Sequence, residues 1–166
     1  MTTSEGRVVV GVSPSLAGLA ALRYAVAEAK RRGAPLVAVR AWYLNGSMRG
    51  MDEPRWREEM AVEAVRTLYG AFEDGLGGVP ADVDVTAGVT ENRADLALLA
   101  VADRRFDLLV LGGRSGWLMS WIVKHCLRAA VCAVVVVPPP ELARTRSRRA
   151  AVRALLRDAE EYTAQN

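Results

Sequence analysis

The sequence predicts an α/β fold in which a five-stranded, mostly parallel sheet is covered by helices on both faces. Five short runs rich in β-branched residues alternate with four longer stretches that have helical spacing. That alternation is typical of right-handed βαβ crossovers. The 166 residues, 51% hydrophobic and 25% charged, are typical of a soluble domain with a sizeable core.

The first strand and helix are predicted from a β-branched run followed by capping residues. Arg7–Val12 is apolar on both sides, as expected of a strand inside a parallel sheet. Ser13 or Ser15 can cap the helix that the spacing of apolar residues predicts over Leu16–Arg32. Gly33 suits the residue that follows the end of this helix.

The next unit repeats this order with a longer helix. Pro35–Trp42 reads as the second strand, and Tyr43–Met51 reads as a loop. Asp52 suits the cap of a long helix that runs to about Asp74, and Gly75–Gly78 ends it. In the second half of the chain, Asp82–Ala87 is predicted to be an exposed edge strand and Asn92–Asp103 a helix. A buried strand over Asp107–Gly112 is followed by a glycine loop, Gly112–Gly116. A helix over Trp117–Ala130 and a last strand over Ala133–Val137 complete the predicted domain.

We therefore predict an α/β domain over residues 1–140 and a basic, helical tail over residues 141–166. The tail holds six arginines between Arg144 and Arg157 without an acidic residue. A helix packed on the domain or a self-association segment is favoured. Contact with nucleic acid is disfavoured, since acidic Glu160 and Glu161 follow and the net charge is only +3.

Neither a disulfide framework nor a zinc cluster is expected from two cysteines and one histidine. Cys126 and Cys132 are predicted to be buried, inert thiols, and a reducing cytoplasm fits them. His125 lacks a recognisable nucleophile partner, so a structural role is favoured. Asp82, Asp84 and Asp107 are interpreted as solvating strand ends. We expect no catalytic residue, no metal site and no membrane span.

Two stretches resemble the universal stress protein family. One runs from Val8–Val12 through Ala20–Ala25 to Arg32–Val37, and the other is Asp107–Gly112, rejoined at Leu127 and Cys132–Val137. The resemblance covers about residues 7–137. It implies strand order 3-2-1-4-5, as in the adenine nucleotide alpha hydrolase-like fold, and a homodimer formed through the last strand, Ala133–Val137.

ATP-binding members of that family are similar in three places. An Asp ends strand 1, a small or apolar stretch follows strand 3, and a Gly-x-x-Gly loop leads to Gly-Ser or Gly-Thr after strand 4. Glycines let backbone N–H groups approach phosphates at a helix N-terminus. The resemblance thus points to the ends of strands 1, 3 and 4.

The chain departs from this pattern at each place. Ser13 stands at the Asp position, and Glu91 brings a negative charge after strand 3. Ser115 replaces the second glycine, with Gly116 one place late. The loop is shorter by about five residues, which puts Ser120 and then Trp121 where Gly-Ser would be. We expect no tight ATP binding.

The leading hypothesis is a non-enzymatic, homodimeric binding or regulatory module without a cofactor. The alternative is a nucleotide-binding stress-response protein for ATP, AMP or cyclic AMP, and a weak ATPase is third. Trp117 and Trp121 are expected either to plug the vacated cleft, which is slightly favoured, or to offer a surface to a protein partner. If a nucleotide is bound, the expected site residues are Val12, Ser13, Trp42, Val89, Gly112, Gly113, Arg114, Gly116 and Ser120.

Overall fold

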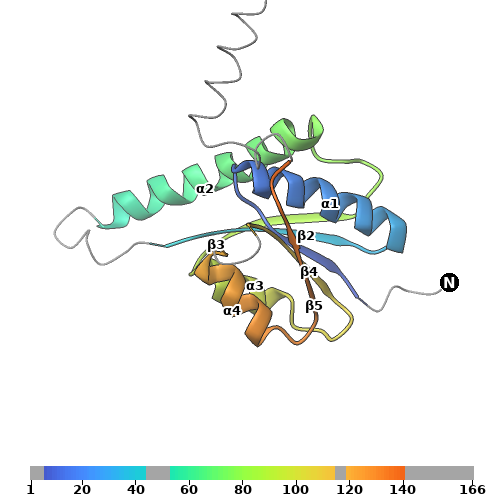
Figure 1. Cartoon of the computed structure of the whole chain (residues 1–166). Helices are drawn as coiled ribbons and strands as arrows, with labels where there is room; N and C mark the ends of the chain where they lie inside the picture. Colours follow the sequence, from blue (N-terminus) through green and yellow to red (C-terminus); the bar gives the residue numbers. More distant parts are fainter. Residues whose placement is uncertain (1–5, 44–52, 115–118, 141–166) are drawn as a thin grey trace, which may run out of the picture.

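A computed structural model describes residues 6–43, 53–114 and 119–140 of the chain. These residues form one five-stranded parallel sheet in the order β3-β2-β1-β4-β5 (Figure 1). The predicted fold class and strand order are confirmed. The strands are β1 (Val8–Gly11), β2 (Leu36–Trp42), β3 (Val85–Glu91), β4 (Leu108–Gly112) and β5 (Ala133–Val137), and the helices are α1 (Leu16–Arg32), α2 (Glu53–Leu76), α3 (Ala94–Val101) and α4 (Trp121–Ala129).

Helices cover both faces of the sheet. Figure 1 shows α1 and α2 on one face and α3 and α4 on the other. Each face has its own hydrophobic core: Leu22 and Phe72 are buried on the α1 and α2 side, whereas Leu98 and Val123 are buried on the α3 and α4 side. The central strands β1 and β4 are covered from both sides, which explains why their sequences are continuously apolar.

The ends of α1 follow the sequence signals closely. The Ser15 hydroxyl accepts a hydrogen bond from the Gly18 N–H at 3.0 Å, so Ser15 is the cap. Gly33 adopts φ 61°, a left-handed conformation that favours glycine. The helix therefore begins and ends where the sequence predicts, at Leu16 and Arg32.

α3 is shorter than predicted by two residues at each end, and two other elements, β3 and α4, differ from their predicted bounds by three residues or more. β3 spans Val85–Glu91, so it begins three residues and ends four residues later than expected, because it pairs with β2 from Leu36–Val85 to Trp42–Glu91. α4 begins at Trp121, because the Ser120 hydroxyl caps it by accepting from the Val123 N–H at 3.3 Å. β3 is an edge strand as predicted.

The interpretation of Asp107 as a solvated strand end was also wrong. Its side chain is fully buried, and its carboxylate accepts hydrogen bonds from the Arg7 Nη2 at 2.6 Å and the Arg7 backbone N–H at 2.8 Å. Burial alone would raise the pKa of Asp107, but these bonds outweigh it and hold the pKa below its usual value. Asp107 thus fixes the chain just before β1 against the start of β4.

Several predictions fall on residues that the structure does not describe. The helical tail over 141–166, the Asp52 cap, Gly116 and Trp117 lie outside the described residues. Within the described part of the chain, no helix combines the length and apolar character needed to cross a membrane.

Candidate functional site

A cavity of about 180 Å³ lies where the carboxyl ends of β1, β2 and β4 meet. Open parallel sheets bind ligands at this edge, near the point where the strand order reverses. α3 and α4 form its other wall. The described residues that line it are Gly11, Val12, Ser13, Val39, Arg40, Ala41, Ala94, Leu98, Leu111, Gly112, Ser120, Ile122 and Val123.

Four of the predicted site residues line this cavity: Val12, Ser13, Gly112 and Ser120. Ser13 follows β1, and its hydroxyl is 2.8 Å from the hydroxyl of Ser15. Ser120 caps the N-terminus of α4, so a hydroxyl and a helix N-terminus lie at the same wall. These groups offer hydrogen bonds to a polar ligand at the rim of an apolar space.

Gly112 has a packing role as well as a place in the cavity wall. A Cβ on Gly112 would lie 2.5 Å from the backbone carbonyl of Ala17, because the end of β4 approaches the first turn of α1 this closely. Only glycine fits there without displacing backbone. The glycine that the sequence pattern assigns to phosphate is therefore required by helix–strand packing.

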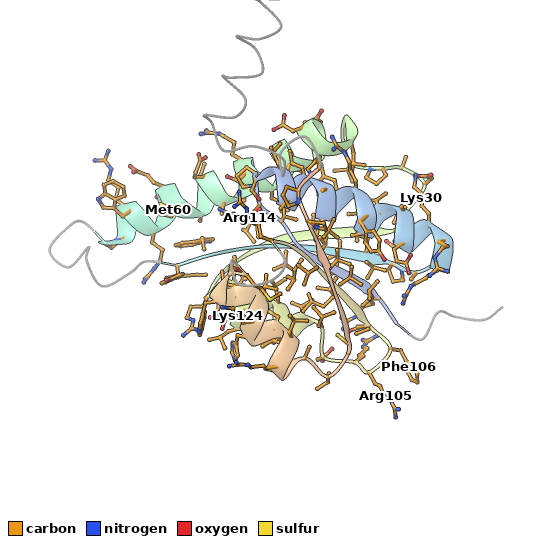
Figure 2. All side chains as sticks on the ribbon, viewed as in Figure 1. Lys30, Met60, Arg105, Phe106, Arg114 and Lys124 are labelled. Carbon is orange, nitrogen blue, oxygen red and sulfur yellow. The ribbon has the colours of Figure 1, made fainter. Side chains whose placement is uncertain are left out.

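Gly113 and Arg114 do not line the cavity. The Gly113 N–H donates to the Val137 carbonyl at 3.0 Å, which extends the pairing between β4 and β5. Arg114 is exposed on the segment that follows β4, and it is labelled in Figure 2. The backbone donor expected at Gly113 is thus already used within the fold.

Trp42 and Val89 lie elsewhere. Trp42 is buried at the end of β2, and Val89 is in β3, packed against the core on the α1 and α2 side. The residue expected to repel phosphate, Glu91, instead lies 3.0 Å from the Arg57 Nε of α2 and does not line the cavity. Val89 and Glu91 lie inside β3, and not after it, because this strand ends four residues later than the sequence pattern indicated.

Sequence reasoning missed Arg40, the only charged side chain among the described residues that line the cavity. Its Nη1 donates to the Val12 carbonyl at 3.3 Å, and its buried Nε has no hydrogen-bond partner. A signal was present in the sequence: Arg40 interrupts the apolar run Leu36–Trp42, and strands inside parallel sheets seldom carry a charge.

Trp121 does not plug the cavity, so the favoured expectation for this side chain was wrong. It is 58% exposed and stacks on the His125 ring, with 5.4 Å between ring centroids. The Arg93 guanidinium lies 4.4 Å from the centre of the indole. The indole is held on the outer side of α4 by these contacts, and the Ser120 hydroxyl lines the cavity instead.

His125 and Arg93 share the buried carboxylate of Asp95. The His125 Nδ1 lies 2.5 Å from Asp95 Oδ2, and the Arg93 Nη2 donates to the same oxygen at 2.9 Å. Burial alone would raise the pKa of Asp95, but both hydrogen bonds outweigh it, so the pKa is lowered. The cluster joins α3 to α4 behind the cavity wall.

The two cysteines are free thiols. Burial raises the pKa of Cys126 to about 11, and it also raises the pKa of Cys132. Thiols of this kind are poor nucleophiles at neutral pH. In the described ranges, no three His, Cys, Asp or Glu side chains gather as a metal site.

Comparison with known proteins identifies relatives of the whole fold. The model of the universal stress protein family matches residues 6–138. No curated protein shows significant sequence similarity to the chain.

Solved structures share the fold at low sequence identity. A universal stress protein UspA from Lactobacillus plantarum has a TM-score of 0.60 at 20% identity, with 80% of this chain and 97% of that chain covered. A family protein from Burkholderia pseudomallei has a TM-score of 0.58 at 21% identity, covering 84% and 99%. A universal stress protein in complex with cAMP has a TM-score of 0.60 at 20% identity, covering 82% and 99%. The family match over most of the described residues, together with the strand order, shows that this chain belongs to the universal stress protein family.

Proposed function

We propose that this chain is a non-catalytic binding and regulatory module whose cavity takes a ligand smaller than ATP. The size and character of the cavity carry the proposal. At about 180 Å³ it is below the range of about 300–1,000 Å³ typical of small-molecule sites. Three phosphates need many converging donors, whereas its described side chains are mostly apolar.

The glycine segment after β4 supports the same proposal. Gly112 is packed closely against the backbone of α1, and the Gly113 N–H donates a hydrogen bond to β5. The segment is also short, since α4 begins at Trp121. Few backbone donors are left among the described residues to hold a triphosphate.

A second candidate function is binding of an adenine nucleotide with one phosphate. Two observations favour it: a family member of the same fold is a complex with cAMP, and Val12, Ser13, Gly112 and Ser120 come together at the cavity. A nucleoside monophosphate needs fewer donors than ATP. The hydroxyls of Ser13 and Ser120, on two sides of the apolar floor, are donors for one phosphate group.

Isothermal titration calorimetry with ATP, AMP, cAMP and adenosine tests both candidates. We expect no saturation by micromolar ATP and tighter binding of AMP or cAMP. Saturation by micromolar ATP would overturn the proposal that the cavity excludes triphosphates. Heat-denatured protein, precipitated and extracted, should release no ATP carried through purification.

The absence of catalysis is part of the proposal. The described polar contact of His125 is to the carboxylate of Asp95, and not to a hydroxyl or thiol that it would activate. The strand-1 carboxylate of ATP-binding relatives is replaced by Ser13. We expect no ATP hydrolysis above background in a phosphate-release assay.

We also propose that the module is a homodimer through β5 and works in the cytoplasm. β5 is at the edge of the sheet, so no other described strand pairs with its outer backbone groups, and a second copy could do so. Trp121 and Ile122 are both exposed on α4, and they are the surface on which we expect a protein partner.

A further inference from the structure

Arg40 is an unusual group to find in the cavity wall. It comes from β2, and its neighbours along the strand, Val39 and Ala41, also line the cavity. Arg40 is half-buried, and a guanidinium in such a place is costly unless its charge and its N–H groups are satisfied. The described residues give it one hydrogen bond, a 3.3 Å contact to the Val12 carbonyl, and leave its buried Nε without a partner.

In the part of the chain that the structure describes, no carboxylate balances the charge of Arg40. None of the ion pairs among the described residues includes Arg40, although most other buried or half-buried charges are paired. The described cavity lining contains no Asp or Glu. The lining therefore carries one formal positive charge in an apolar space, and an anion is the group that would complete it.

The other polar side chains of the cavity suit the same ligand. Ser13 and Ser120 are hydroxyl groups on the β1 and α4 sides, and Arg40 lies on the β2 side. Three donors on three elements surround a small apolar space lined by Leu98, Leu111 and Ile122. A planar guanidinium binds the two oxygens of a phosphate or carboxylate in a fork, which a hydroxyl alone cannot do.

We propose that Arg40 binds the single anionic group of the ligand from the β2 side of the cavity, so that the site selects a nucleoside monophosphate over the neutral nucleoside. This inference rests on the proposed function for its cavity. It places the anion on strand β2, and not on the glycine segment that follows β4.

The test compares adenosine, AMP and inorganic phosphate by calorimetry on the full chain and on three variants. Arg40→Met removes the charge and keeps much of the volume, and Arg40→Lys keeps the charge but not the fork. Arg66→Gln is the matched control, because it removes one positive charge from an exposed position on α2 that forms a surface pair with Glu63.

In the unaltered chain and in Arg66→Gln we expect AMP to bind at least about tenfold more tightly than adenosine, as a charge-assisted pair allows. In Arg40→Met the two ligands should bind equally, and Arg40→Lys should fall between. We also expect Arg40→Met without ligand to melt no lower than the unaltered chain, because it removes a half-buried charge that has no ion-pair partner among the described residues.

The outcomes separate this inference from the proposed function. AMP and adenosine binding equally well with and without Arg40 would refute the role of Arg40 and leave the adenine site standing. Phosphate binding that depends on Arg40, without any adenine binding, would support the anion site and refute the nucleotide. If neither adenosine, AMP nor inorganic phosphate binds, the anion site and the adenine site are both refuted. A lower melting temperature in Arg40→Met with an unchanged AMP preference would show that Arg40 only braces β1 and β2.

Discussion

Asp107 shows how one side chain links distant parts of the sequence. Its carboxylate is buried against Arg7, one hundred positions earlier, and Arg7 also reaches Asp103 at 2.8 Å. We expect Asp107→Asn to lower the free energy of unfolding by about 2–3 kcal/mol, because it leaves the half-buried Arg7 with a weaker partner. Urea denaturation at neutral pH measures this loss.

The pH dependence of that loss follows from the lowered pKa of Asp107. A carboxyl group with a lowered pKa stabilises the fold above its unfolded value, near pH 4, and this contribution is lost as pH falls through the folded pKa. The difference between the two proteins should be constant at neutral pH and narrow below about pH 4. Asp82→Asn, which breaks an exposed pair with Lys30, serves as the control and should not change stability measurably. A pH-independent difference would contradict the ion pair.

For single residues, the sequence predicted the caps of α1 but not the partners of buried charges. Ser15 and Gly33 act on residues next to them, so a local pattern is sufficient. Asp107 and Arg40 depend on residues that only the fold brings near. The apolar sequence around Arg40 marked it as exceptional, yet nothing nearby in the sequence showed that it would reach a cavity.

At the scale of the element, two glycines in helical surroundings should respond oppositely to alanine. Gly33 follows α1 and has φ 61°, whereas Gly70 lies inside α2. A Cβ at either position would have no contacting atom within 4 Å, so packing does not oppose alanine at either glycine. Gly33→Ala should destabilise the protein by about 1 kcal/mol through backbone strain. Gly70→Ala should stabilise it by about 0.5–1 kcal/mol by raising helix propensity. Thermal denaturation of both variants measures the pair, and a shift of the same sign in both would refute the assigned conformations.

The errors in element boundaries have a common physical origin. The bounds of β3 were mispredicted because they depend on its pairing register with β2, which is a tertiary property. The alternation of polar and apolar residues after Asp82 resembles a strand, but the sequence alone does not show where pairing begins. The helix predicted from Trp117 begins at Trp121, since the hydroxyl of Ser120 outweighs the apolar run before it. Of the eight expected site residues that the structure describes, four line the cavity: Val12, Ser13 and Gly112 lie at the ends of β1 and β4, which the sequence located well, and Ser120 caps α4.

For the molecule as a whole, the open edge at β5 determines the expected assembly. The Val137 carbonyl accepts from Gly113, so the backbone groups of Val137 face β4. Because backbone groups alternate along a strand, those of Val136 face the open edge. If the proposed dimer forms through β5, Val136→Pro should remove an outward N–H and leave a monomer in sedimentation velocity, while circular dichroism shows the fold retained.

Val135→Pro is the matched control for that experiment. By the same alternation its N–H faces β4, so proline there should damage the fold itself. A Val136→Pro protein that stays dimeric would place the dimer contact on another surface, and the exposed α4 face around Trp121 would be examined next.

The buried thiol of Cys126 gives this fold a built-in probe of local opening. With a pKa of about 11 and no exposure, it can react with an alkylating reagent only when α4 lifts from the sheet. Val123 of α4 and its cap Ser120 also line the cavity, so a ligand bound there would stabilise the packing of α4 on the sheet. The alkylation rate at the Cys126 sulfur thus reports whether a bound ligand stabilises the whole α3 and α4 layer, which is how the proposed binding module would transmit its occupancy.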